Sequence, residues 1–305
     1  MIFGKIGNDC STGGFFADFF TVLSTSIEAK RNNLIPYVEL TQTRFSAVPY
    51  FAGIKLDENG ANKIRGIENN TAFCGTVPVA EPEVKMDDEN TWNWWFEQQI
   101  PSSADEVLDF NIFLNSFNQS NHFWNGGIVD EVKVAKSFFN DFFKIRKHIK
   151  DNVDSYYNLN FKNKKILGVM ARLNEMNKFH SMYGTHTKFN YLEHTKDILN
   201  KFTDIDSIFL VTEDNDCVEL FKENFDNLLY LDVFRRTTQP IEHCENSSTW
   251  YYENPPRDLH GKLLGDECLT QALLLGMCDY LICKHCGTSS AGILFSVNIK
   301  DVFYI

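Results

Sequence analysis

Short apolar runs alternate with amphipathic stretches along the second half of this chain, and no other feature of the sequence constrains the fold as strongly. The apolar runs predict strands at KILGVMAR (165–172), SIFLVTED (207–214), LLYLDVF (228–234) and DYLIC (279–283). The stretches between and after them predict helices at 190–201, 217–224, 264–277 and 289–296. Strands that alternate with helices form a parallel, doubly wound sheet with right-handed crossovers. We therefore expect a Rossmann-like layout, although this half contains no GxGxxG motif.

The first half opens with a similar order of elements. A strand is predicted at 2–6, a glycine-rich turn at 11–14, a helix at 15–30 and a second strand at 35–40. The aromatic region 45–125 predicts loops and short helices. Apolar spacing over 132–149 predicts one amphipathic helix, and the polar segment 150–165 then leads into the second half. We place the domain boundary in this segment, which gives domains of residues 1–155 and 156–305.

Size and charge limit the classes of protein to which this chain can belong. With 43% hydrophobic and 23% charged residues, the composition is that of a globular protein. A length of 305 residues favours two domains, with one large α/β domain as the alternative. A formal net charge of −12 does not favour wide contact with a phosphate backbone, so nucleic acid is not an expected partner. No apolar stretch reaches the roughly 18–20 residues of a transmembrane segment, and no signal peptide is visible. The expectation is a cytoplasmic protein.

The stretch CDYLICKHCGTSSAGILF (278–295) contains a candidate metal or redox site. Cys278, Cys283 and Cys286 together with His285 supply the atoms of a zinc ligand set. Alternation along a strand would point Cys283 and Cys286 to opposite faces, and no second CxxC or histidine pair with zinc-like spacing occurs. We therefore expect reduced cysteines in the core, no metal and no redox dithiol.

Polar side chains follow three of the predicted strands in the second half. In open α/β sheets, ligands bind beyond the carboxyl ends of the strands, so these side chains are expected to converge on one crevice. The three groups are Arg172, Asn174, Glu175, Lys178 and His180; Thr212, Glu213, Asp214, Asn215 and Asp216; and His285, Cys286, Gly287, Thr288, Ser289 and Ser290.

These groups contain the chemistry of an anion site. CGTSS (286–290), between a strand and a helix, offers backbone N–H groups and small hydroxyls that suit a diphosphate. The same hydroxyls can cap the helix, and the two roles can coexist. Arg172 suits a bidentate phosphate contact, with a salt bridge to a neighbouring carboxylate as the alternative. Asp214-Asn215-Asp216 is a DxD tripeptide, which either holds a divalent metal against a diphosphate or begins a helix.

Several segments, in the same order along the chain, resemble the fucosyltransferase-like glycosyltransferases with two facing Rossmann-like domains (the GT-B arrangement). This group includes the core α1,6-, nodulation and protein O-fucosyltransferases. ILGVMARLNEMNKFH (166–180) resembles their G-V-H-x-R-x-T-D segment, and SIFLVTEDNDCVELFKENF (207–225) resembles their strand, A-T-D-D and helix. ECLTQALLLGMCDYLICKHCGTSSAGILF (267–295) is similar to their closing helix, strand and turn. NTWNWWFEQ (90–98) is similar to an N-x-W-x-Y-Y-F-E stretch, and residues 11–40 to their opening glycine turn and helix.

The resemblance implies an α/β, GT-B fold with parallel sheets in both domains. It implies an inverting, metal-independent transfer of a sugar, first of all L-fucose from GDP-fucose, to a glycan hydroxyl. Residues 1–155 would then bind the acceptor and residues 156–305 the nucleotide-sugar donor. By position, Arg172 matches the arginine that binds the donor diphosphate. The segment near the guanosine contains Thr212, Glu213 and Asp214. The turn that binds the diphosphate contains Gly287, Thr288, Ser289 and Ser290.

Some positions depart from the family pattern. Met170 stands where the family usually has histidine, Leu173 where some members have a second arginine, and Asn174-Glu175 in place of Thr-Asp. Three alternatives therefore stay open. They are another donor sugar such as xylose or mannose, a metal-dependent DxD transferase, and a non-catalytic protein that binds carbohydrate or nucleotide.

An inverting transfer also needs a base for the acceptor hydroxyl. His180 stands where the core α1,6-fucosyltransferases have a candidate glutamate base, and the alternatives are Glu175 and His186. His180 is thus the first candidate for this role.

Residues outside these segments are also expected to contact the substrates. His260 and Arg235, predicted to lie in the loop after the third strand, are expected to reach the donor. Gly13 and Gly14 are expected to contact the donor from the first domain, and Asp18 to face the acceptor.

Overall fold

The computed structural model describes residues 1–7, 15–40, 90–110, 129–173, 186–235, 257 and 259–305. Its larger sheet is parallel, with the strand order β10-β9-β6-β7-β8. Every residue of β6, β7 and β9 is buried, as expected for parallel strands covered on both faces. The strands are β6 (Ile166–Ala171), β7 (Ser207–Thr212), β8 (Leu228–Tyr230), β9 (Tyr280–Cys283) and β10 (Asp301–Tyr304).

Side-chain caps fix the starts of the helices on this sheet. Thr187 and Asn190 form a capping box at the start of α7 (Lys188–Lys201). The Asp214 carboxylate accepts a hydrogen bond from the backbone N–H of Cys217 at 3.1 Å, which begins α8 (Asn215–Asn224). Within the described residues, this half also contains the helices α5 (Lys147–Asn160), α10 (His260–Leu275) and α11 (Gly287–Leu294).

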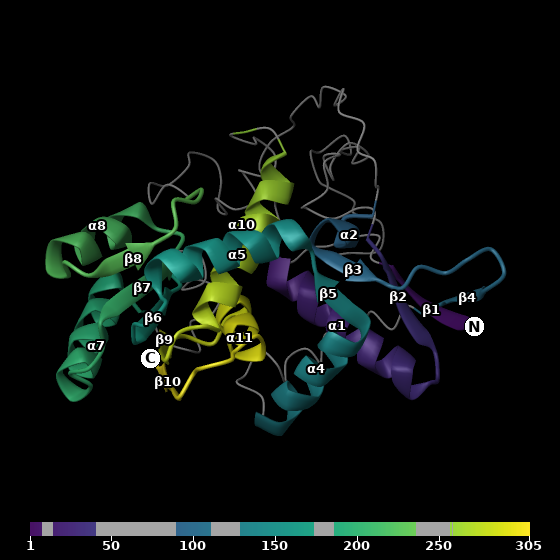
Figure 1. The fold of residues 1–305 in the computed structure, drawn as a ribbon, viewed down its shortest axis with the longest axis horizontal. Coiled ribbons are helices and arrows are strands. Elements are labelled where there is room, and N and C mark those ends of the chain that lie inside the picture. Colours follow the sequence, from purple (N-terminus) through teal and green to yellow (C-terminus); the bar gives the residue numbers. More distant parts are fainter. Residues whose placement is uncertain (8–14, 41–89, 111–128, 174–185, 236–256, 258) are drawn as a thin grey trace, which may run out of the picture.

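A smaller parallel sheet with the order β2-β1-β4 lies at the other end of the molecule (Figure 1). Its strands are β1 (Ile2–Gly7), β2 (Ile35–Glu39) and β4 (Glu106–Asp109). Helix α1 (Phe15–Arg31) lies between β1 and β2 in sequence and buries Phe16, Phe19, Phe20 and Leu23. The structure thus confirms an α/β chain with two parallel sheets.

The region between the sheets differs from the prediction of one helix over 132–149. That stretch contains the end of one helix, a short strand and the start of the next helix: α4 (Val129–Phe142), β5 (Phe143–Ile145) and α5. Strand β5 pairs antiparallel with β3 (Phe96–Gln98), which directly follows the short helix α2 (Trp92–Trp95). The polar segment 150–165, predicted to be a connection, is helical up to Asn160.

Arg146 gives the physical reason for this interruption. Its backbone N–H donates to the carbonyl of Trp95 at 2.9 Å, and its side-chain Nε donates to the carbonyl of Asn93 at 2.7 Å. The backbone bond takes the N–H that a continuous helix would donate to the carbonyl four residues earlier, and the side-chain bond strengthens the contact. The alternation of apolar residues at 143 and 145 suits the strand equally well.

Other element boundaries also differ from the predictions. Strand β8 ends at Tyr230, whereas the prediction extended it to 234. Helix α10 begins at His260 and not at 264, so His260 belongs to the first turn of a helix and not to a loop. Strands β4 and β10 were not predicted.

A continuous apolar core joins the two halves. One cluster combines α1 and the aromatic segment of α2 with Leu269 and Ala272 of α10 and Ala291 and Leu294 of α11. Helices α10, α11, α5 and α1 accordingly lie between the two sheets (Figure 1). A boundary at residues 155 and 156 falls inside α5 and stays a prediction.

The cysteines of the 278–295 stretch lie in the core. Cys278 and Cys283 are fully buried, and Cys286 is 3% exposed. All three belong to one apolar cluster, so the prediction that Cys283 and Cys286 point to opposite faces is wrong. The reason is that Cys286 has already left the strand and forms part of the cap of α11.

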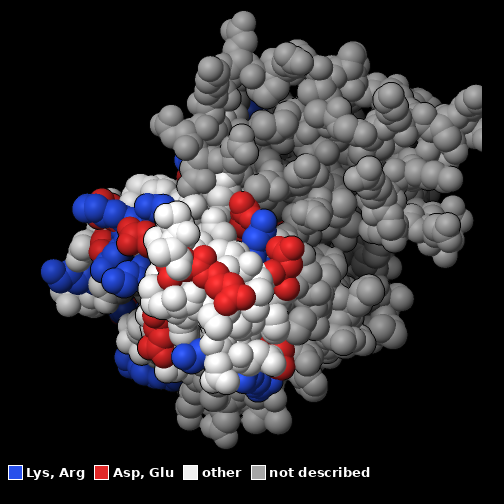
Figure 2. Space-filling model, turned by 90° about the vertical axis from the view of Figure 1, so that its right-hand side faces the viewer, with Lys and Arg blue, Asp and Glu red and all other residues white. Residues whose placement is uncertain are grey.

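The described surface has a mixed charge distribution. On the face shown in Figure 2, acidic and basic side chains of the described residues lie close together among uncharged ones. None of the helices in the described part of the chain has the length and apolar character needed to cross a bilayer.

Candidate functional site

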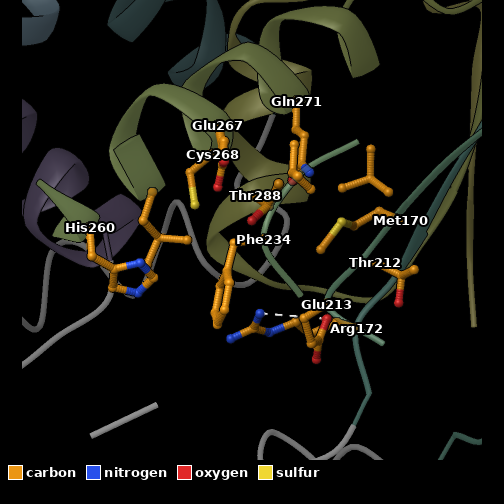
Figure 3. Close-up of a pocket in the computed structure, with 13 residues that line it drawn as sticks. Met170, Arg172, Thr212, Glu213, Phe234, His260, Glu267, Cys268, Gln271 and Thr288 are labelled. Atoms are coloured by element: carbon orange, nitrogen blue, oxygen red, sulfur yellow. Dashed lines mark ion pairs between the residues drawn. The ribbon is translucent and has the colours of Figure 1, made fainter. Parts of the chain in front are cut away.

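A pocket opens at the carboxyl ends of β6 and β7, between the larger sheet and helix α10 (Figure 3). It contains about 640 Å³ of space between protein atoms, part of which is open to solvent. The lining residues are Met170, Arg172, Val211, Thr212, Glu213, Val233, Phe234, His260, Leu264, Glu267, Cys268, Gln271 and Thr288.

The register of the sheet brings Arg172 and Glu213 together. Ala171 of β6 lies opposite Thr212 of β7, so the next residue of each strand leaves the sheet at the same level. Arg172 Nη1 lies 3.6 Å from Glu213 Oε2, which is an ion pair but too long for a hydrogen bond. Glu213 Oε1 accepts a hydrogen bond from the backbone N–H of Leu173 at 3.0 Å. The carboxylate therefore holds the backbone that follows β6 as well as the guanidinium.

A hydrogen bond to Tyr191 holds the backbone of Arg172 in place. The Tyr191 hydroxyl accepts this bond from the backbone N–H of Arg172 at 3.3 Å, and Tyr191 is fully buried. Burial raises the pKa of this phenol well above its usual value, so the hydroxyl stays protonated. Arg172 is thus fixed at its backbone while its side chain, 25% exposed, extends into the pocket.

One face of α10 forms the opposite wall. Its pocket-lining residues are His260, Leu264, Glu267, Cys268 and Gln271. They are adjacent or three or four positions apart, and this spacing puts their side chains on one side of the helix. Gly265 faces the other way, where a Cβ atom would lie 2.4 Å from the Trp95 ring. Trp95 also donates from its indole N–H to Asp266 at 2.9 Å. These contacts set the rotation of α10 about its axis.

A bidentate ion pair strengthens this wall. Arg257, just before α10, donates from Nη1 and Nη2 to the two oxygens of Glu267 at 2.7 and 2.8 Å. Its guanidinium lies over the Phe234 ring, with 5.6 Å to the ring centroid. The ring of Phe234 in turn meets that of His260 edge to face, 4.8 Å between centroids. Figure 3 shows Phe234 between His260 and Arg172.

The turn 286–290 provides one pocket residue and a tightly built cap. Thr288 lines the pocket. The hydroxyl oxygen of Ser289 lies 2.7 Å from the carbonyl oxygen of Lys284 and 2.9 Å from that of Cys286, which share its single proton, and it accepts from the Cys286 N–H at 3.1 Å. A Cβ atom on Gly287 would lie 2.7 Å from the Cβ of Phe16 in α1, so glycine is required here for close packing. Ser289 therefore has the capping role that the sequence left open.

The DxD carboxylates are used within the protein. Asp214 is 5% exposed and caps α8. Asp216 lies in the first turn of that helix and forms an ion pair with Lys188 at 3.6 Å. Both observations match the alternative that this tripeptide begins a helix.

The structure brings five of the predicted site residues into one pocket: Arg172, Thr212, Glu213, His260 and Thr288. Four predicted residues lie behind it or beside it: Asp214, Gly287, Ser289 and Ser290. Arg235 donates to the carbonyls of Leu231 and Val233 in its own loop. The residues Gly13, Gly14, Glu175 and His180 lie outside the described part of the chain.

Sequence reasoning missed four residues that shape the pocket: Phe234, Arg257, Glu267 and Gln271. Glu267 and Gln271 carry a signal that could have found them, because positions 264, 267 and 271 share one face of the helix predicted at 264–277. Arg257 has no such signal.

Comparisons with known proteins give matches among solved structures only. No protein-family model and no curated protein matches the chain. The fucosyltransferase NodZ from Bradyrhizobium is 13% identical, with a TM-score of 0.46 over 96% of this chain and 92% of that one. A mutant of Arabidopsis thaliana FUT1 in complex with GDP is 11% identical, with a TM-score of 0.46 over 99% and 69%. POFUT1 in complex with GDP-fucose is 9% identical, with a TM-score of 0.46 over 99% and 97%. What this chain binds has to be inferred from its own pocket.

Proposed function

We propose that this chain is an inverting glycosyltransferase that takes a sugar from a nucleoside diphosphate, GDP-fucose first of all, and transfers it to a glycan hydroxyl. One observation carries the proposal. An arginine at the carboxyl edge of the central strand and the first turn of a helix border the same pocket, through Arg172 and Thr288. This is the place in an open α/β sheet where a ligand is expected, and the pair has the chemistry that a diphosphate requires.

The leaving diphosphate gains negative charge as the bond to the sugar breaks. Arg172 supplies a permanent positive charge with five N–H donors, so it can approach phosphate oxygens while Glu213 stays close. The N-terminus of α11 adds backbone N–H groups and the positive end of the helix dipole. Groups placed in advance around a developing charge lower the barrier for its formation.

The nucleoside would occupy the space between the sheet edge and α10. Thr212 and Glu213 offer a hydroxyl and a carboxylate oxygen that can accept hydrogen bonds from a base such as guanine. Phe234 and His260 offer ring surfaces beside it. Met170 also lines the pocket, at the position where the resembling enzymes usually have histidine, so the base contacts would differ from theirs in detail.

We propose that the transfer needs no metal ion. The support is that the two DxD carboxylates are used for a helix cap and for an ion pair with Lys188. Arg172 and the helix N-terminus supply the charge that a metal would otherwise supply. The base that deprotonates the acceptor is proposed to be His180, with Glu175 as the alternative. Both belong to the segment after Leu173 that the structure does not describe.

The test is a thermal melt with GDP, UDP and their sugar conjugates, each with and without EDTA, followed by a donor-hydrolysis and transfer assay. A ligand that binds only the folded state raises Tm. We expect GDP and GDP-fucose to raise Tm equally in the presence and absence of EDTA, and GDP-fucose to be consumed when glycans are added. A rise with UDP alone would assign another donor, and a rise lost in EDTA would assign a metal-dependent enzyme. Binding without turnover would indicate a non-catalytic protein, and no rise with any nucleotide would overturn the proposal.

A further inference from the structure

The α10 wall contains a chain of three polar side chains that lead from Glu267 through Arg257 to His260. The first link is the bidentate contact at 2.7 and 2.8 Å, in which both oxygens of Glu267 and both terminal nitrogens of Arg257 take part. The second link runs from Arg257 Nε to His260 Nδ1 at 3.4 Å. Leu259 between them has a φ of 51°, in the left-handed region, so the backbone turns sharply where it enters α10. That turn brings Arg257 back over the helix it precedes.

The second link fixes the protonation pattern of His260. A guanidinium has only donors and does not lose its proton in proteins, so Nδ1 of the imidazole must be the acceptor. A neutral imidazole whose Nδ1 accepts carries its proton on Nε2. An imidazolium has no acceptor nitrogen, so this contact requires the neutral ring. His260 thus lines the pocket as a neutral ring whose donor is Nε2.

Packing holds this arrangement in one geometry. The Phe234 ring contacts Arg257 on its face and His260 edge to face, with centroid distances of 5.6 and 4.8 Å. Such contacts restrict the rotamers of all three side chains. The three come from the loop after β8, from the third position before α10 and from the first turn of α10, so the cluster also ties these segments together.

Arg257 also changes the net charge of the pocket wall. Among the described residues that line the pocket, the charged side chains are Arg172, Glu213 and Glu267. Without Arg257 the two carboxylates would outnumber the arginine, and a diphosphate would meet a net negative wall. The bidentate contact neutralises Glu267 and removes that repulsion.

We propose that Arg257 is a positioning residue of this pocket. Anchored by Glu267, it holds His260 as the Nε2–H tautomer in the wall of the nucleotide pocket, and it cancels the charge of Glu267. The ligand in this statement rests on the proposed function, whereas the tautomer is a property of the protein alone. The two parts can therefore fail separately.

The tautomer is tested by NMR of the ligand-free protein with ¹⁵N-labelled histidine. The signals of His260 are assigned by their loss in His260→Gln, and one-bond and long-range couplings distinguish a protonated from an unprotonated ring nitrogen. We expect Nε2 to carry the proton in the wild type, and Arg257→Met to give a mixture of tautomers or a protonated ring. A wild-type ring protonated on Nδ1, or an unchanged pure Nε2–H pattern in Arg257→Met, would overturn this part.

The effect on the ligand is tested by calorimetric titration of GDP into the wild type and four variants. Arg257→Met removes the hydrogen bond to His260 and exposes the charge of Glu267, so we expect GDP to bind about 10- to 100-fold more weakly. The double variant Arg257→Met/Glu267→Gln restores the charge balance but not the tautomer, so it should recover only part of the loss. Arg257→Lys keeps the charge without the fork, and should bind between the wild type and Arg257→Met. Arg31→Met, which removes an exposed arginine of α1 paired with Glu28, is the matched control and should bind as the wild type does.

Each outcome of this titration has a defined meaning. Equal GDP affinity in the wild type and Arg257→Met would overturn the ligand part of the proposal. Full recovery in the double variant would reduce the role of Arg257 to charge alone and overturn the role of His260. If the wild type binds no nucleotide, the proposed function fails and the ligand part falls with it, while the NMR result still decides the tautomer. Melting curves of all variants show whether a loss of binding reflects a loss of fold.

Discussion

The pocket has an arginine and a glutamate on each of its two walls, and the two pairs are built differently. At the sheet edge, Arg172 approaches Glu213 through one contact of 3.6 Å. On the helix wall, Arg257 and Glu267 share two hydrogen bonds of 2.7 and 2.8 Å. A bidentate pair commits both carboxylate oxygens and the fork of the guanidinium, whereas a single long contact does not. We infer that the sheet-edge pair provides the group that meets the ligand, and that the helix-wall pair keeps the wall in place.

The largest expected effect is on turnover, and it differs between Arg172 and Arg257. Arg172→Met keeps the apolar stem but removes the charge that would stabilise the leaving diphosphate, so we expect kcat with GDP-fucose to fall by about 10²- to 10³-fold. Arg257→Met should lower the apparent affinity for the donor more than it lowers kcat, because it acts through His260. Initial rates over a range of donor concentrations measure both constants. If Arg172→Met turned over as the wild type does, the sheet-edge pair would have no catalytic role.

A second prediction compares the two glutamates by stability. Glu267→Gln replaces one of two charge-assisted hydrogen bonds, and the free energy of unfolding should fall by about 1–2 kcal/mol. Glu213→Gln can still accept from the Leu173 N–H through its amide oxygen and loses only a long ion pair, so the loss should be below about 1 kcal/mol. Urea unfolding of the two variants gives both values. The reverse order would mean that the sheet-edge pair is the structural one.

A third prediction concerns the carboxylates beside the sheet-edge pair. Asp214→Ala removes the cap of α8 and should lower the free energy of unfolding by about 1 kcal/mol. Asp216→Ala removes only a partly exposed ion pair with Lys188 and should change it by less than about 0.5 kcal/mol. Neither change should depend on added Mg²⁺. Stabilisation of the wild type by Mg²⁺ that is lost in both variants would return the DxD tripeptide to the role of a metal site.

The smallest expected effect is a pH dependence next to the turn that carries Thr288. The ring of His285 stacks on Tyr304 at 4.1 Å, and burial lowers its pKa below the ordinary 6.5. The unfolded chain therefore binds a proton at this residue before the folded protein does, and stability falls as the pH drops below about 6.5. His285→Phe keeps the stack but cannot take up a proton, so it should lose less stability between pH 7.5 and 5.5 than the wild type. Equal losses in urea unfolding at these two pH values would show that His285 does not contribute.

The sheet-edge pair could be predicted from the sequence, whereas the helix-wall pair could not. Strands β6, β7 and β9 are nearly continuous apolar runs, so their positions and their carboxyl ends were predicted to within two residues. Arg172 and Glu213 follow directly from those ends. The Arg257–Glu267 contact spans an entry into α10 at which Leu259 adopts a left-handed conformation, and nothing in the residue types indicates such a turn.

The errors in the fold have a related cause. Apolar residues over 132–149 fit a helix, but pairing with β3 converts 143–145 into a strand, and that partner lies far away in sequence. The hydroxyl of Ser289 suits both a ligand and a cap, and only the positions of the Lys284 and Cys286 carbonyls decide that it caps. Sequence patterns predict elements with local periodicity, whereas contacts between distant segments determine which of two allowed roles a side chain takes.

Calorimetric titration of GDP into the wild type and Arg172→Met, in the presence of EDTA, tests the central claim most directly. The account predicts that the wild type binds GDP in EDTA and that Arg172→Met binds it at least tenfold more weakly while melting as a folded protein. Absence of GDP binding to the wild type, or equal affinity of the two proteins, would contradict the assignment of this pocket to a nucleoside diphosphate.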